Sequence, residues 1–151
     1  MATIFTKIIN GEIPCYKVAE TDKFLAFLDI NPNAKGHTLC IPKKETNKIF
    51  DLEEDEYTEL MKFSRKVAQA MRKVIDCKRI GMTVIGLEVP HVHVHLIPLH
   101  NMGSMDFKNK ETLQLGIIID IVIQVDFENI NHKSVYVCLS VCPPVCPSVA
   151  K

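Results

Sequence analysis

The chain has 151 residues, the length of a single domain with room for a sizeable core. Lysine plus arginine and aspartate plus glutamate both number 18, so the formal net charge is zero. A neutral chain gives no electrostatic reason to expect nucleic acid or a membrane surface as a partner. No apolar run approaches the ~20 residues of a membrane span. Residues 1–7 lack the pattern of a signal peptide, so we expect a cytoplasmic protein.

The first third of the chain predicts a short helix followed by two strands. Residues 4–9 are mostly apolar, with Thr3 as a candidate N-cap and Gly11 as the stop signal after them. Residues 24–30 and 36–42 have the composition of strands and are separated by an Asn-Pro-Asn turn. We expect these two strands to form an antiparallel pair.

The middle of the chain predicts one long helix and two more strands. Residues 53–75 carry apolar side chains at helical spacing, and Asp51 is a candidate cap. Residues 79–85 and 91–97 read as strands. This order predicts an α+β fold in which an antiparallel sheet of about five strands packs with one long and one short helix.

The most informative stretch is 91–97, with the sequence His-Val-His-Val-His-Leu-Ile. Alternation is typical of a half-buried strand, so His91, His93 and His95 should share one face while the apolar residues between them face a core. Three imidazoles on one face are poor core material. Each ring must therefore be hydrogen-bonded, bound to a metal or hydrated.

Three interpretations of this stretch compete. The histidines can hold a catalytic metal, with Glu88 or His37 as the candidate further ligand. They can be structural, bonded to backbone groups at a sheet edge. They can also serve nucleophilic catalysis, because a neutral imidazole attacks phosphorus and leaves again readily.

The pattern of residues 91–97 resembles the signature of the histidine triad (HIT) superfamily of nucleotide hydrolases and transferases. The resemblance extends further: residues 3–9 with 12–14 look like the start of the Hint branch of that family, and residues 24–44 look like its central hairpin. It implies a HIT-like α+β domain, a homodimer whose sheets join across the two-fold axis, and no cofactor.

The resemblance also implies roles for individual residues. His93 would be the nucleophile that attacks the α-phosphorus of a purine nucleotide, and His95 would contact the phosphate and assist the leaving group. His91 and His37 would support them, and Asp29 would bind the ribose hydroxyls. The remaining side chains would line the pocket for the base and sugar: Phe5, Phe27, Ile30 and Val89.

Two departures from the Hint pattern affect the chemistry. Thr3 and Thr6 stand near the place where many members carry a cysteine pair that binds structural zinc, so we expect no metal there. Glu88 occupies the position of a Ser or Thr hydroxyl that would donate to the leaving group. A carboxyl group there can act as a general acid or bond a leaving amine, and it disfavours long polyphosphates.

These observations predict a hydrolase that releases a nucleoside 5′-monophosphate from an amine, acyl or phosphate leaving group through a covalent nucleotidyl-histidine. Two alternatives stay open. One is a nucleotide-binding scaffold with little turnover, and the other is a metalloenzyme built on three histidines.

The resemblance covers the predicted domain at residues 1–112 and fades in a divergent extension at 113–151. The extension contains β-prone apolar segments and the cysteines Cys138, Cys142 and Cys146 beside three prolines. Metal binding and disulfides are possible uses of these cysteines. We favour a loosely packed extension or an oligomer contact.

Overall fold

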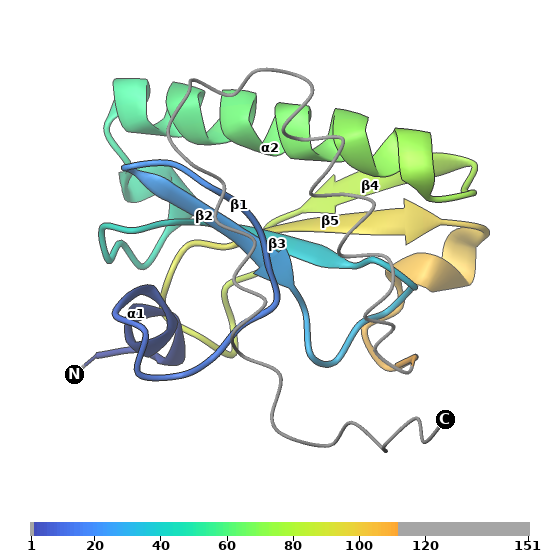
Figure 1. The fold of residues 1–151 in the computed structure, drawn as a ribbon, viewed down its shortest axis with the longest axis horizontal. Coiled ribbons are helices and arrows are strands. Elements are labelled where there is room, and N and C mark those ends of the chain that lie inside the picture. The colour runs from blue at the N-terminus through green and yellow to red at the C-terminus, as the bar shows by residue number, and fades with distance from the viewer. Residues whose placement is uncertain (1, 112–151) are drawn as a thin grey trace, which may run out of the picture.

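A computed structural model describes residues 2–111 of the chain (Figure 1). The expected extension at 113–151, with its three cysteines, lies outside the described residues. The described elements follow in chain order: α1 (Ile4–Ile9), β1 (Lys17–Glu20), β2 (Phe24–Leu28), β3 (Thr38–Pro42), the 3₁₀ helix η1 (Ile49–Asp51), α2 (Glu54–Val74), β4 (Arg79–Thr83), β5 (Val94–Leu99) and the 3₁₀ helix η2 (Met102–Met105).

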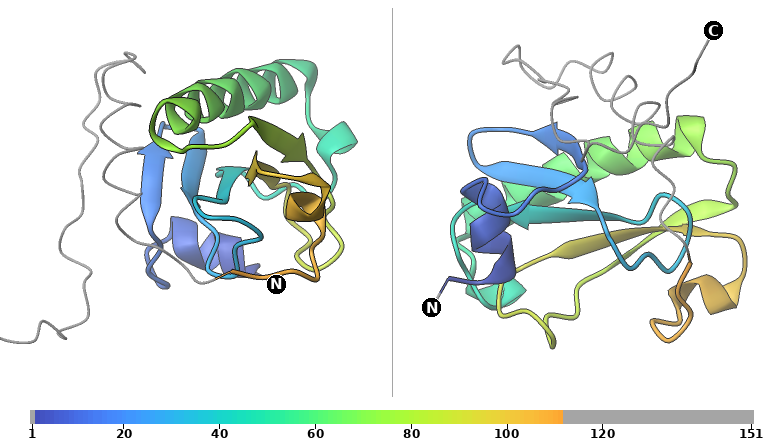
Figure 2. Two further views of the ribbon diagram at one scale, coloured as in Figure 1. Left: turned by 90° about the vertical axis from the view of Figure 1, so that its right-hand side faces the viewer. Right: turned by 60° about the horizontal axis from the view of Figure 1, so that its bottom comes forward.

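The five strands form one sheet in the order β1-β2-β3-β5-β4, and every neighbouring pair is antiparallel. The long helix α2 crosses one face of this sheet, and the short helix α1 lies on the opposite side (Figures 1 and 2). The predicted α+β architecture is therefore confirmed. Strand β1 is the one strand that the sequence did not mark individually.

A side-chain cap marks the start of α1 but not the start of α2. The hydroxyl of Thr3 accepts a hydrogen bond from the backbone N–H of Thr6 at 3.1 Å, which confirms Thr3 as the N-cap of α1. Gly11 follows that helix with a φ of 76°, a conformation that glycine adopts without strain. The predicted cap of α2 was wrong, because Asp51 belongs to η1 and the cap position is Glu53, which makes no side-chain cap bond.

The predicted strand at residues 91–97 was misplaced, because β5 runs from Val94 to Leu99. Ahead of it, the N–H of His91 donates to the carbonyl of Val89, and the N–H of Val92 donates to the carbonyl of Thr46. These loop contacts take the donors that a strand partner would need. His91 and His93 therefore precede the strand.

The predicted bounds of the other three strands were too long at one end. The structure ends β2 at residue 28, begins β3 at residue 38 and ends β4 at residue 83. Within the sheet, the register of β3 against β5 places Leu39 opposite His95 and Cys40 opposite Val94.

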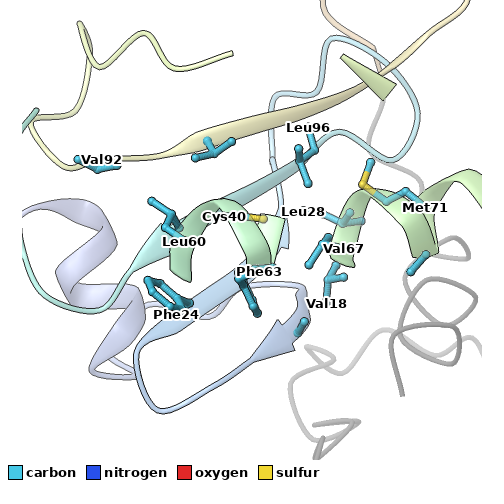
Figure 3. Packing of buried hydrophobic residues seen from close by; sticks show 14 of the residues in the cluster. Val18, Phe24, Leu28, Cys40, Leu60, Phe63, Val67, Met71, Val92 and Leu96 are labelled. Atoms are coloured by element: carbon cyan, nitrogen blue, oxygen red, sulfur yellow. The ribbon is translucent and has the colours of Figure 1, made fainter. Parts of the chain in front are cut away.

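The apolar core lies between the sheet and α2 (Figure 3). The rings of Phe24 and Phe63 stack there with centroids 5.6 Å apart. The apolar residues between the histidines join this core, as predicted: Val92, Val94 and Leu96. Because side chains alternate along a strand, the other face of the sheet carries a second, smaller cluster, made of Phe5, Leu25, Phe27, Leu39 and Ile41.

Candidate active site

The histidines gather on the side of the sheet that α2 leaves uncovered. His91, His93 and His95 are 0%, 6% and 7% exposed, and His37, the residue immediately before β3, is 1% exposed. The ring centroids of His93 and His95 lie 4.8 Å apart, and those of His37 and His95 lie 5.2 Å apart. Four buried imidazoles require hydrogen-bond partners, and those partners define the chemical state of each ring.

The orientation of His93 follows from one hydrogen bond. Its Nδ1 lies 2.6 Å from the carbonyl oxygen of His91. A carbonyl oxygen only accepts, so Nδ1 carries the proton and donates it. In the neutral ring, Nε2 then holds a free lone pair, which is the state that a nucleophilic imidazole needs. The ring of Phe5 packs edge-on against this imidazole with centroids 5.2 Å apart.

His91 is held at both ring nitrogens. Its Nε2 donates to the carbonyl oxygen of Pro42 at 2.8 Å, which leaves Nδ1 to accept from the hydroxyl of Thr3 at 3.2 Å. Burial lowers the pKa of His91, and the bond to Pro42 opposes that shift. The ring is therefore neutral at pH 7, and its two hydrogen bonds fix its orientation beside the site.

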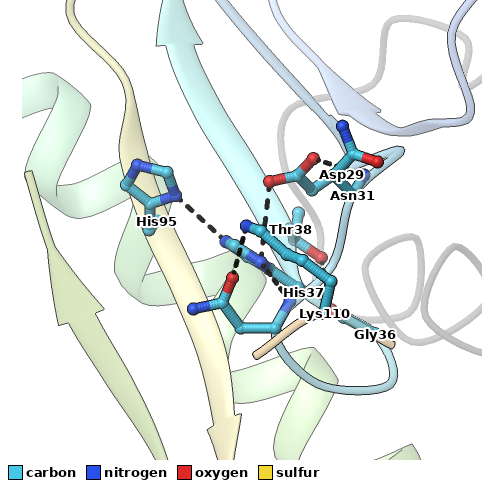
Figure 4. A network of polar contacts seen from close by, with 8 residues as sticks. Asp29, Asn31, Gly36, His37, Thr38, His95 and Lys110 are labelled. Carbon is cyan, nitrogen blue, oxygen red and sulfur yellow. Dashed lines mark hydrogen bonds and ion pairs between the residues drawn. The ribbon is translucent and has the colours of Figure 1, made fainter. Parts of the chain in front are cut away.

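His37 and His95 form a directional pair that begins at a backbone amide (Figure 4). The N–H of Asn33 donates to Nδ1 of His37 at 3.1 Å, so His37 carries its proton on Nε2. That Nε2–H donates to Nδ1 of His95 at 3.0 Å. His95 in turn carries its proton on its own Nε2 and has that N–H available as a donor.

Both members of this pair are neutral at physiological pH. Burial lowers the pKa of His37 to about 3, and the positive charge of Lys110 acts in the same direction. Burial also lowers the pKa of His95 to about 3, again with contributions from neighbouring charges. The pair can therefore offer a hydrogen bond without adding a positive charge.

Asp29 lies at the outer end of the pair. Its Oδ2 is 3.6 Å from Nδ1 of His37, and its Oδ1 accepts from the N–H of Asn31 at 2.8 Å (Figure 4). The carboxylate is partly buried. An acceptor in this position can bind hydroxyl groups of a ligand.

The segment after β5 packs against the pair formed by His37 and His95. The ring of Phe107 packs edge-on against His95 at 5.0 Å and against His37 at 6.3 Å. The ammonium of Lys110 lies 5.3 Å from the centre of the Phe107 ring and donates to Oδ1 of Asn33 at 2.9 Å. This segment therefore brings apolar cover and a positive charge to the buried pair.

The structure brings together three of the four apolar residues predicted for the base and sugar pocket. The rings of Phe5 and Phe27 meet edge-on with centroids 5.8 Å apart, and Val89 packs against the same cluster. Ile30 is not in this cluster and is 65% exposed. Glu88 is also exposed, in the loop before the histidines.

Asp29, His37 and His95 are the one group within residues 2–111 whose ligand atoms lie close enough to share a metal ion, all within 4.8 Å of one another. The three alternating histidines do not form such a group there. The hydrogen bonds among Asn33, His37 and His95 engage both ring nitrogens of His37 and Nδ1 of His95. The group therefore differs from the predicted ligand set of the three alternating histidines.

Several residues at the site escaped the sequence reasoning. Thr3 and Thr6 were noted only as a helix cap and as residues near the cysteine pair of many family members, and Asn33 only as part of a turn. No pattern marked Glu45, Phe107 or Lys110, because each contacts its partner at the site across a long stretch of chain.

Comparison with known proteins agrees with this geometry. The sequence profile of the HIT domain matches residues 10–102. The adenosine 5′-monophosphoramidase of Saccharomyces cerevisiae is 42% identical over 104 residues, which cover 68% of this chain and 66% of that protein. An uncharacterized HIT-like protein of Borreliella burgdorferi is 36% identical over 121 residues, covering 76% and 87%.

Solved structures agree in fold. The crystal structure of a Hit-like protein from Bartonella henselae, described as involved in cell-cycle regulation, superimposes with a TM-score of 0.70 at 30% identity and covers 81% of this chain and 95% of that one. No helix among residues 2–111 is long and apolar enough to cross a membrane. The profile match spans more than half of the 151 residues. The chain therefore belongs to the HIT family.

Proposed function

We propose that this protein is a nucleotide phosphoramidase that releases a purine nucleoside 5′-monophosphate from an amine, acyl or phosphate leaving group. The proposal includes a covalent nucleotidyl intermediate on His93. The yeast relative at 42% identity carries the name adenosine 5′-monophosphoramidase, and a fission-yeast relative at 39% identity carries the same name. These names support the reaction class for this chain.

One observation carries the proposal: neighbouring rings have opposite hydrogen-bonding character. The bond to the His91 carbonyl leaves a lone pair on Nε2 of His93, and the bond from His37 leaves an N–H on Nε2 of His95. The two rings are 4.8 Å apart between centroids. A lone pair beside a neutral donor matches an attack on a phosphate group, which needs a nucleophile and a hydrogen bond to an oxygen of that group.

The proposed reaction proceeds in two displacements. The lone pair of His93 Nε2 forms a bond to the α-phosphorus, and the bond from phosphorus to the leaving nitrogen or oxygen breaks. The leaving atom keeps the electron pair and takes a proton from water, while His95 donates a hydrogen bond. A second water then attacks phosphorus and gives up a proton to solvent, the electron pair of the bond to His93 returns to Nε2, and the nucleoside monophosphate leaves.

The nucleotide would lie along the face that carries Asp29. In this proposal the Asp29 carboxylate accepts from the ribose hydroxyls. The apolar cluster of Phe5, Phe27 and Val89 would contact the base and sugar, and the exposed Ile30 would cover the base once it binds. Burial of the exposed Ile30 side chain against a bound purine would remove apolar surface from water.

We also propose a cytoplasmic homodimer. Strand β4 is one of the two end strands of the sheet among residues 2–111, and Met82 on it is 47% exposed. An end strand with exposed apolar side chains offers a surface for a second sheet. Sedimentation of the full chain would test the dimer.

The decisive experiment mixes the protein with adenosine phosphoramidate, quenches the reaction and measures the intact mass. We expect an adduct of one nucleoside monophosphate on the wild type and none on His93→Gly. Hydrolysis by His93→Gly should be at least ~10³-fold slower, because the nucleophile is gone. His100→Gln is the matched control, since His100 is exposed.

Undiminished hydrolysis by His93→Gly would overturn the proposal. Nucleotide binding without turnover by the wild type would instead favour the scaffold alternative. One tightly bound zinc or iron per chain, required for turnover, would favour the metalloenzyme alternative.

A further inference from the structure

We propose that a chain of hydrogen bonds from Glu45 through Thr6 and Thr3 to His91 positions the nucleophilic ring of His93. The inference rests on the proposed function, since it concerns how His93 is held for attack. Glu45, Thr6 and Thr3 are positioning residues in this proposal. They act through His91 and do not touch the substrate.

The chain of hydrogen bonds begins at Glu45, an exposed residue in the loop after β3. The hydroxyl of Thr6 donates to Oε2 of Glu45 at 2.5 Å, and this bond lowers the pKa of Glu45. The hydroxyl oxygens of Thr6 and Thr3 are 3.0 Å apart, and the backbone N–H of Thr6 donates to the Thr3 hydroxyl at 3.1 Å. Each hydroxyl has one proton, and that of Thr6 is used on Glu45, so the link from Thr6 to Thr3 is the backbone N–H of Thr6. The single proton of Thr3 is then left to donate to a further partner.

The hydroxyl proton of Thr3 is donated to the ring of His91. Nδ1 of His91 lies 3.2 Å from the Thr3 hydroxyl, and its Nε2 donates to the carbonyl of Pro42. A carbonyl cannot donate, so Nδ1 is the accepting nitrogen and Thr3 is the donor. The next residue, Val92, donates its N–H to the carbonyl of Thr46, beside Glu45. Thr3, the cap of α1, therefore holds His91, and the loop after β3 holds the residue that follows it.

The last link is the carbonyl of His91. It accepts the proton of His93 Nδ1 at 2.6 Å and so places the lone pair on Nε2. The ring of Phe5, on the same helix as Thr3, contacts both His91 and His93 edge-on, with centroids 5.8 Å and 5.2 Å away. A displaced α1 would free His91 to rotate and would remove the ring that packs against His93.

A simple capping role does not account for these contacts. A cap explains the bond from the Thr6 N–H to Thr3. It does not explain the bond from Thr3 to a ring 88 residues further along the chain, or the bond from Thr6 to a carboxylate 39 residues away. Thr3 is 8% exposed, so its donation to His91 takes place in a buried setting where an unpaired ring nitrogen is costly.

The test compares four variants of the full chain. Thr3→Val keeps the shape of the side chain and removes the hydroxyl, while Thr3→Ser restores the hydroxyl. Glu45→Ala removes the acceptor at the exposed end. Glu12→Ala is the matched control, because Glu12 is an exposed acid that accepts from Asn10 at the other end of α1. Nitrogen-15 signals of the imidazole rings report the tautomer of each histidine, and steady-state kinetics report kcat and KM.

In the wild type, Thr3→Ser and Glu12→Ala, we expect the ring of His93 to be protonated at Nδ1 alone. In Thr3→Val and Glu45→Ala, we expect its signals to move toward a mixture of the two tautomers. We expect kcat to fall about tenfold while KM stays within about twofold, because misplacing a reacting group slows the reaction without weakening binding.

An unchanged His93 tautomer and unchanged kcat in a folded Glu45→Ala protein would overturn the inference, even if Thr3→Val does not fold. A loss of thermal stability without a change in tautomer would mean that the contacts only anchor α1, and would also overturn it. If the wild type forms no nucleotide adduct, the proposed function fails. The ring signals would still report whether the hydrogen-bonded chain holds His93.

Discussion

The two faces of the sheet are built for different purposes. The face under α2 buries apolar side chains against one another, and the rings of Phe24 and Phe63 stack within that cluster. The opposite face buries four imidazoles, and His37, His91 and His93 each have a partner on the backbone. Burial of apolar side chains stabilises the fold on the first face. On the second face, the hydrogen-bond partners of the buried rings define which nitrogen of each ring carries a proton.

This difference means that the same kind of substitution should have different effects on the two faces. A change under α2 should alter the free energy of unfolding and leave the chemistry of each folded molecule intact. A change among the histidines should alter the reaction and the response to pH. The following predictions test that separation, from the largest expected effect to the smallest.

The largest effect should come from the α2 face. Phe63→Ala removes a buried aromatic ring and should reduce the free energy of unfolding by about 3–5 kcal/mol. Activity per folded molecule should stay near that of the wild type. Denaturant titration measures the first quantity, and kinetics at low temperature measure the second. Lys62→Ala, at an exposed position of the same helix, should change stability by less than ~0.5 kcal/mol. A selective loss of activity in Phe63→Ala would contradict the separation.

The next effect should come from the histidine pair. His37→Leu removes the donor to His95 Nδ1, so His95 can move its own proton to that nitrogen and lose its donor toward the substrate. We expect kcat to fall about 30-fold, or ~2 kcal/mol, with little change in KM. His37→Gln can still donate from a similar position and should recover part of the rate. Equal rates for the two variants would argue against a role for this hydrogen bond.

Stability should fall as the pH is lowered. The folded pKa values of His37 and His95 are about 3, against an ordinary value of 6.5, so the unfolded chain binds more protons between these values. Each histidine then contributes stability that is fully present above pH 6.5 and is lost toward pH 3, with a slope of up to ~1.4 kcal/mol per pH unit. Guanidinium titrations at pH 7, 6, 5 and 4 measure the slope. It should become smaller in His37→Gln and stay unchanged in His100→Gln.

The smallest effect should come from the charge beside the pair. Lys110→Met removes a positive charge that helps to lower the pKa values of His37 and His95, so both should rise. The change in stability at pH 5 should be below ~1 kcal/mol, because Lys110 is exposed and solvent screens its charge. Proton NMR titration of the ring signals measures the two pKa values, and denaturant titration at pH 5 measures the change in stability. Lys108→Met, a neighbouring exposed lysine, should leave the titration unaltered.

Much of the architecture could be predicted because it depends on local patterns. Alternation placed Val92, Val94 and Leu96 on the core face, and the capping chemistry of Thr3 marked the start of α1. The cap of α2 was misassigned to Asp51 because a 3₁₀ helix precedes that helix, and such a short turn leaves no distinct periodic signal.

The site was predicted only in part. The histidine motif and its resemblance to a family identified which residues to inspect, and the matched profile agrees with that family. The start of β5 was missed because Thr46, from a distant loop, takes the N–H of Val92. Such a contact has no trace in the local sequence. Phe107 and Lys110 were missed for the same reason.

The amino-acid sequence by itself determined the mixed class of fold, the long helix, the side of the chain that faces the core and the presence of an imidazole cluster. These properties depend on spacing along the chain, which is readable residue by residue. Only the tertiary structure decided which nitrogen of each ring carries the proton, because the deciding groups are the carbonyls of His91 and Pro42 and the amide of Asn33. Neutral imidazole has two nearly equivalent tautomers, so its chemistry is assigned by the partners that folding brings to it.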